Sequence, residues 1–228
     1  MKAAVLFSGG KDSCYTLWKG IIDKYDIVSL IIVHSKNPES WMFHYPNVQW
    51  AELQAEALGM PCIIIKTLGK KEEELKDLEN VLMKLKNEMR IEAILSGAIA
   101  SKYQKQRIDF LCSKLEIKSI APLWNRDQAE VVKEEIKSGF KIIITACQAL
   151  GLNKKWLGRE MSLNFLKELI YLNEKFGLNI AGEGGEYETF VIDGPNFNKR
   201  IKISNVEISG NDSSGQMIIR NAKLEEKF

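Results

Sequence analysis

The sequence lacks several features that would assign it to a class at once. Its cysteines are far apart and form no Cys-x-x-Cys pair, so their spacing predicts neither a zinc site nor an iron–sulfur site. No apolar run approaches the roughly 20 residues that cross a membrane. The N-terminus enters a predicted strand directly, so we expect no signal peptide. Scattered thiols fit a reducing compartment, and we expect a cytoplasmic protein with no membrane partner.

An excess of charge of one sign is also missing. The chain has 32 Lys and Arg residues against 30 Asp and Glu, a formal net charge of +2. This balance supplies no broad basic field, so we expect no nucleic-acid partner, although a local basic patch stays open. A hydrophobic content of 45% in 228 residues is ordinary for a globular protein, with room for one large α/β domain and a smaller one.

The most informative stretch is the phosphate loop, Ser8-Gly9-Gly10-Lys11-Asp12-Ser13. It lies between an apolar run of strand length, 3–7, and a segment with helical spacing of its apolar residues, 14–22. A strand, a glycine turn and a helix in this order point the first N–H groups of the helix toward a bound anion. The order therefore predicts a phosphate cradle.

The residue types of the phosphate loop suit that use. Gly9 and Gly10 let the main chain approach a phosphate oxygen, because they carry no Cβ. Ser8 and Ser13 offer hydroxyl donors, and Lys11 adds a mobile positive charge. We predict that these five residues bind the phosphates of a nucleotide.

Asp12 is the unusual member of the loop. A carboxylate beside a phosphate site is repulsive unless a cation lies between them, which predicts Mg²⁺ with Asp12 as its ligand. The alternative is an ordinary capped helix start, but a cap requires neither the second glycine nor the lysine.

The phosphate loop resembles the PP-loop of the N-type ATP pyrophosphatases, which split ATP into AMP and pyrophosphate. It is not the Walker pattern, which has four residues between its first Gly and its Gly-Lys pair. The resemblance implies ATP and a fold of the adenine nucleotide alpha hydrolase-like type. It does not choose the substrate that is activated.

Strand and helix patterns alternate in the first half of the chain. Strands are predicted at 3–7, 27–33, 62–65, 91–95 and 118–121, and helices at 14–22, 48–58, 72–89 and 101–115. This alternation predicts an α/β fold, a parallel sheet of five or more strands with helices on both faces. The pattern breaks at 122–127, so we expect a PP-loop ATP-binding domain at 1–124 and a smaller α+β substrate-binding domain at 125–228.

The second half has fewer elements. Helices are expected at 127–138, with Ala129, Val132 and Ile136 facing inward, and at 161–176. A strand is expected at 140–146, and an antiparallel hairpin without catalytic content at 200–208 and 216–224.

Loops at the carboxyl ends of parallel strands line the ligand crevice, and two of them carry candidate ATP contacts. The fourth strand is followed by small residues and a polar helix start, and the candidates there are Gly97, Ser101, Tyr103, Gln104 and Arg107. The aromatic loop after the second strand contains His44, which is suited to wall a nucleobase pocket or to face the substrate. A structural role for this histidine stays open.

The acidic segment, residues 182–189, is the second stretch that packing does not explain. Glu183, Glu186 and Glu188 lie in a glycine-rich turn before a strand, where they repel one another unless a cation or a donor-rich substrate lies between them. The alternative is an exposed acidic loop.

The phosphate loop, Met-Phe-His at 42–44, the polar helix start at 101–107, Pro-Leu-Trp at 122–124 and the acidic segment together resemble the diphthine–ammonia ligase family, including its archaeal members. The resemblance covers nearly the whole chain and is thin only over the C-terminal hairpin. It implies that ATP adenylates the carboxylate of diphthine on translation elongation factor 2, and that ammonium then gives the amide as the last step of diphthamide biosynthesis.

The resemblance also implies roles. Lys11 and Asp12 would act on the phosphates and Mg²⁺. Glu183, Glu186 and Glu188 would lie near the activated acyl group, and we expect one of them to bind ammonium or take a proton from it.

The sequence is also compatible with two other functions. One is a PP-loop enzyme that thiolates or amidates tRNA, although the cysteine pair or basic extension common in such enzymes is missing. The other is a nucleotide-sensing module without turnover. A homodimer is also left open.

Overall fold

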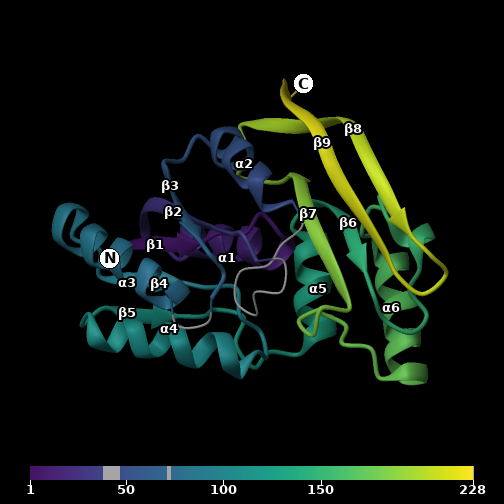
Figure 1. The fold of residues 1–228 in the computed structure, drawn as a ribbon, viewed down its shortest axis with the longest axis horizontal. Coiled ribbons are helices and arrows are strands. Elements are labelled where there is room, and N and C mark those ends of the chain that lie inside the picture. The colour runs from purple at the N-terminus through teal and green to yellow at the C-terminus, as the bar shows by residue number, and fades with distance from the viewer. Residues whose placement is uncertain (38–46, 71–72, 228) are drawn as a thin grey trace.

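A computed structural model describes residues 1–37, 47–70 and 73–227. Within these residues the chain forms a five-stranded sheet and a four-stranded sheet with helices packed around them. Figure 1 shows the two sheets side by side, with the long C-terminal hairpin along the outer edge of the molecule.

The first sheet is parallel, as predicted, with strand order β3-β2-β1-β4-β5. Its strands are β1 (Lys2–Leu6), β2 (Asp26–Ser35), β3 (Cys62–Thr67), β4 (Ala93–Leu95) and β5 (Lys118–Ile120). The strand order reverses between β1 and β4, and ligands bind outside the carboxyl ends of strands at such a switch point. The phosphate loop follows β1, so it lies at this position.

Helices cover both faces of the parallel sheet, which confirms the predicted α/β fold. Ala3 and Val5 of β1 face a core shared with α1 (Lys11–Ile22) and α2 (Ala51–Leu58). Ala4 faces the opposite core, to which α3 (Glu73–Met89) and α4 (Lys102–Lys114) contribute. This alternation follows from the period of two in a strand.

The helix predicted at 48–58 is shorter than expected, because Val48–Trp50 forms a 3₁₀ turn and α2 begins at Ala51. The Asn47 side chain bonds the backbone of Met217 and Ile219, and the indole of Trp50 donates to the Ile219 carbonyl at 2.9 Å. These contacts with a distant strand hold the turn, and local periodicity does not reveal them.

The second sheet is antiparallel, with order β7-β6-β9-β8. Its strands are β6 (Lys141–Cys147), β7 (Tyr187–Asp193), β8 (Lys199–Gly210) and β9 (Gly215–Glu226). The same half of the chain contains the helices α5 (Gln128–Lys137) and α6 (Leu163–Phe176) and a 3₁₀ turn at Lys154–Trp156. The predicted C-terminal hairpin is confirmed as β8 and β9. The division of the chain into two domains at 124/125 stays a prediction, since the two sheets share one hydrophobic core.

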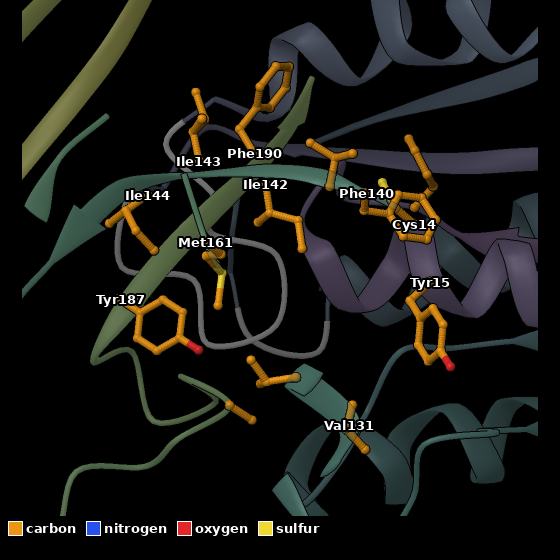
Figure 2. Packing of buried hydrophobic residues seen from close by; sticks show 14 of the residues in the cluster. Cys14, Tyr15, Val131, Phe140, Ile142, Ile143, Ile144, Met161, Tyr187 and Phe190 are labelled. Atoms are coloured by element: carbon orange, nitrogen blue, oxygen red, sulfur yellow. The ribbon is translucent and has the colours of Figure 1, made fainter. Parts of the chain in front are cut away.

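That shared core explains how the halves are joined. Figure 2 shows Cys14 and Tyr15 of α1, Val131 of α5 and Ile142 of β6 in one cluster of buried side chains. The predicted inward face of α5 is confirmed, because Val132 is buried and Ala129 and Ile136 pack against the core, partly buried. The buried face also includes Val131 and Glu135, which were not predicted.

All four cysteines are free thiols. Within the described part of the chain, no helix has both the length and the apolar character that a membrane span requires.

Hydrogen bonds tie the phosphate loop to β7 of the other sheet. The Val191 N–H donates to the Gly9 carbonyl at 3.1 Å. The amide nitrogen of Gln54, a fully buried residue of α2, donates to the carbonyls of both Gly9 and Val191, at 2.8 and 2.7 Å. Gln54 therefore joins three elements at one point.

We predict that Gln54→Leu lowers the free energy of unfolding by about 1–3 kcal/mol, because two buried carbonyls lose a donor. Urea unfolding measures this change. Glu56→Gln is the control, since Glu56 is an exposed residue of the same helix. Equal free energies of unfolding for the two variants would show that the hydrogen bonds of Gln54 do not stabilise the protein.

Candidate active site

A cavity of about 560 Å³ lies where the phosphate loop and the acidic segment meet. The phosphate loop contributes Ser8 and 10–13, and the acidic segment contributes 182–185 and 187–189. Residues 96–98, which follow β4, line the same cavity. Its volume falls in the usual range of small-molecule sites, roughly 300–1,000 Å³.

The backbone of the phosphate loop has no room for a side chain at Gly9. Gly9 has a φ of +81°, and a Cβ there would lie 1.9 Å from Oε1 of Gln54. Gly10 is the N-cap residue of α1 and has no side chain that could cap the helix, so the helix N-terminus faces the cavity. The Ser13 hydroxyl donates to the Gly10 carbonyl at 3.0 Å and holds the turn.

The ammonium of Lys11 is enclosed by carboxylates. Lys11 is only 2% exposed, and its Nζ lies 2.5 Å from Oδ1 of Asp12 and 3.7 Å from Oε2 of Glu135. Burial alone would lower the pKa of Lys11, but the charges of Asp12 and Glu135 outweigh it and raise that pKa. Lys11 therefore keeps its positive charge at the base of the cavity.

Glu183 links the acidic segment to the start of α4. Its carboxylate accepts hydrogen bonds from the backbone N–H groups of Ile99, at 2.6 Å, of Ala100, and of Ser101, at 3.0 Å. Burial raises the pKa of Glu183, and the bond from Ile99 opposes that rise. The carboxylate thus joins the acidic segment to the loop that follows β4.

Glu186 and Glu188 lie in different settings. The Glu186 carboxylate accepts the Gly184 N–H at 2.8 Å and the Asn179 N–H at 3.4 Å, so it stabilises its own loop. Glu188 lines the cavity, and its carboxylate makes no hydrogen bond within the described residues. Burial, with Asp12 adding to it, raises the pKa of Glu188 to about 8. Of the three glutamates, Glu188 is the one whose carboxylate is available to a substrate.

Two family comparisons cover nearly the whole chain. The diphthamide synthase N-terminal domain matches residues 1–119, and the diphthamide synthase C-terminal domain matches residues 127–224. The chain belongs to the diphthamide synthase family.

Similar proteins carry the name diphthine–ammonia ligase. The zebrafish protein (Danio rerio) is 37% identical over 228 residues, which cover 91% of this chain and 88% of that protein. The mouse and human proteins (Mus musculus and Homo sapiens) are 35% and 34% identical, over 91% of this chain and 84% and 85% of theirs. This diphthamide synthase family member is therefore an enzyme of the ligase class.

One solved structure is similar at 20% sequence identity and a TM-score of 0.48, covering 86% of this chain and 98% of the other. It is described as a predicted subunit of tRNA methyltransferase from Methanocaldococcus jannaschii DSM. With a TM-score this low, the similarity says nothing about the function of this protein.

Most of the predicted site residues of this diphthamide synthase family member lie around the one cavity. Those that line it are Ser8, Gly10, Lys11, Asp12, Ser13, Gly97, Ser101, Tyr103, Gln104, Glu183 and Glu188. Their individual roles stay predictions.

Three predicted site residues do not line the cavity, and a fourth lies outside the described residues. Among the described residues, Gly9, Arg107 and Glu186 do not belong to the cavity lining. The guanidinium carbon of Arg107 lies 3.5 Å from the ring centroid of Tyr103, one helical turn back. His44 lies outside the described residues, so its role as a nucleobase or substrate contact stays a prediction.

Besides Gln54, the sequence patterns missed two residues that contact the phosphate loop. Thr189 accepts the Lys11 N–H at 3.1 Å, and it belongs to the acidic segment without having been assigned a role. Glu135 is fully buried beside Lys11, and burial raises the pKa of its carboxyl well above the usual range while Lys11 opposes the rise. The sequence did contain one indication of this residue, because a glutamate at a core-facing position of a helix is unusual.

The residues present fit Mg²⁺ bound together with phosphates. Asp12 lines the cavity, and its side chain is 28% exposed. Among the described residues, no group of three or more His, Cys, Asp or Glu side chains could hold a metal ion. Mg²⁺ in nucleotide sites commonly uses one or two carboxylates and substrate phosphates, and Asp12 in a phosphate cradle provides that arrangement.

We predict that Glu188→Gln stabilises the protein in a pH-dependent way. Between pH 4.5, the usual pKa, and about 8, folded Glu188 keeps a proton that the unfolded chain has lost. The stability of the wild-type protein relative to the variant therefore falls as pH rises through this window. Thermal melting should show similar midpoints near about pH 5 and a higher midpoint for the variant near about pH 9. A difference in melting midpoint between the two proteins that does not change with pH would contradict the raised pKa of Glu188.

Proposed function

We propose that this protein uses ATP to convert the carboxylate of diphthine on translation elongation factor 2 into an amide with ammonium, releasing AMP and pyrophosphate. The observation that carries the proposal is the single cavity shared by the phosphate loop and the acidic segment. The relatives named diphthine–ammonia ligase support the same substrate and product.

The phosphate loop would bind the triphosphate. The N-terminus of α1 offers N–H donors to phosphate oxygens, and Lys11 supplies a positive charge. The Ser8 and Ser13 hydroxyls donate within the loop in this structure and would turn to the phosphates when ATP binds. Mg²⁺ held by Asp12 would neutralise charge on the phosphates. The apolar part of the cavity, formed by Leu6, Ile31, Val33 and Ile108, is suited to the adenine ring.

In the first step a carboxylate oxygen of diphthine attacks the α-phosphorus of ATP. The new P–O bond gives an acyl-adenylate, and the bond to the pyrophosphate oxygen breaks. The negative charge that develops on pyrophosphate lies next to Lys11, which is fixed in place before the reaction and so stabilises the transition state.

In the second step ammonia attacks the acyl carbon and AMP leaves. Ammonium must first lose a proton, and Glu188 is the cavity carboxylate that is not engaged by backbone N–H groups of the described residues. Glu188 in its ionised form would bind ammonium and accept this proton. Glu183 and Glu186 would shape the loop instead of reacting.

Elongation factor 2 is a protein substrate, so the proposal places the enzyme in the cytoplasm with that factor as its partner. The open side of the cavity has to admit the diphthine side chain, while the nucleotide lies against the parallel sheet.

The proposal predicts that protein, ATP, Mg²⁺, ammonium and diphthine-bearing elongation factor 2 together give a factor lighter by about 1 Da, as a hydroxyl becomes an amino group. Intact-peptide mass spectrometry detects the change. Lys11→Ala should abolish it, whereas Glu188→Gln should bind ATP with near-normal affinity and form little amide.

Two controls sharpen this test. Omission of ATP should leave the mass of the factor unchanged. Replacement of the factor by bulk tRNA should give no release of pyrophosphate. Pyrophosphate released with tRNA and not with the factor would reject the proposed substrate, and ATP binding without pyrophosphate release under any condition would reject the enzyme reaction.

A further inference from the structure

Glu135 is a buried carboxylate that the proposed reaction leaves without a role. It lies on α5, outside both glycine loops, and it is 0% exposed. Neither of its carboxylate oxygens has a hydrogen-bond partner within the described residues. The Lys11 ammonium lies 3.7 Å from its Oε2. A carboxylate buried without hydrogen bonds is costly for folding, so packing alone gives no reason for it.

Neutralising Lys11 does not explain Glu135 either. Asp12 already contacts the Lys11 ammonium at 2.5 Å, so this ammonium has a carboxylate partner without Glu135. The two acidic side chains differ in exposure. Asp12 is partly exposed and lines the cavity, whereas Glu135 is fully buried and does not belong to the lining. Glu135 therefore holds the closed side of Lys11.

This arrangement matters once Asp12 acts on Mg²⁺, as the proposed function requires. Asp12 would then share its charge with Mg²⁺, and the carboxyl group of Glu135 would remain beside Lys11. Its position on α5 is fixed by the neighbouring core residues Val131 and Val132, both 0% exposed. The backbone of Lys11 is held separately by Thr189, at 3.1 Å.

We propose that Glu135 is a positioning residue, which holds the Lys11 ammonium from behind so that it faces the phosphates where charge develops during pyrophosphate release. This inference rests on the proposed function. It assigns Glu135 an effect on turnover, because a small displacement of a charge-stabilising group weakens the transition state more than the ground state. It assigns no favourable effect on ATP binding, since a second carboxylate near the triphosphate adds repulsion.

The test compares Glu135→Gln with wild-type protein in three measurements: pyrophosphate release with diphthine-bearing factor, the Kd of ATP by calorimetry, and the melting midpoint. Glu135→Gln keeps the shape of the side chain and removes the carboxyl group that faces Lys11. We expect kcat to fall by at least about tenfold, the Kd of ATP to stay within about twofold, and the midpoint not to fall. Glu135→Asp keeps a carboxyl group and should recover part of the lost kcat.

Glu134→Gln is the matched control, one residue away on the same helix. The Glu134 carboxylate accepts two hydrogen bonds from Arg126, at 2.9 and 2.6 Å, and one from the Tyr15 hydroxyl at 2.8 Å. It does not line the cavity formed by the described residues. This variant should lose stability and keep its kcat, which is the reverse of the result expected for Glu135→Gln.

An unchanged kcat in Glu135→Gln would overturn the inference. So would a loss of kcat accompanied by an equal weakening of ATP binding or by a lower melting midpoint, because the role of Glu135 would then be structural. Wild-type protein that binds ATP but releases no pyrophosphate would refute the proposed reaction instead.

In that case a crystal structure with Mg²⁺ and ATP decides the role of Glu135. Lys11 in contact with both a phosphate oxygen and Glu135 would support the positioning role. Lys11 turned away from Glu135 would overturn it.

Discussion

The geometry of the site depends on the hydrogen bonds between the phosphate loop and β7. The Gly9 carbonyl accepts from Val191 and Gln54, and the Lys11 N–H donates to Thr189. β7 begins at Tyr187, within the acidic segment, so a loop bound to this strand must lie beside that segment. The two sheets also share one hydrophobic core, which leaves the two loops little freedom to separate. The cavity follows from this attachment.

The charged groups of the cavity are suited to the polyphosphate and the ammonium of the proposed reaction. Lys11 is the buried cation of the cavity, and its two acidic neighbours are the partly exposed Asp12 and the fully buried Glu135. Glu188 lies across the cavity on β7, where burial favours its neutral form until a positive charge approaches. Binding of Mg²⁺ at Asp12 and of ammonium at Glu188 would each satisfy a carboxylate that folding leaves exposed to the cavity.

The fold was largely predictable because its signals are local. Apolar runs and helical spacing predicted the five parallel strands, and the glycine turn after β1 pointed to the loop that lines the cavity. The residues that connect the loops were not predictable in this way. Gln54 and Thr189 act on partners 45 and 178 positions away, and Glu135 lies at a helix position that periodicity assigns to the core. The roles of Glu183 and Glu186 depend on which backbone N–H groups the folded loop presents, and sequence spacing does not specify that.

The central claim is that the α-phosphate of ATP and the carboxyl group of diphthine meet in this one cavity. Elongation factor 2 with ¹⁸O in the diphthine carboxylate tests it most directly, because attack of that oxygen on the α-phosphorus transfers it to AMP when the amide forms. Mass spectrometry of the products should find the label in AMP and none in pyrophosphate. Label in pyrophosphate, or amide formation with unlabelled AMP, would contradict the account.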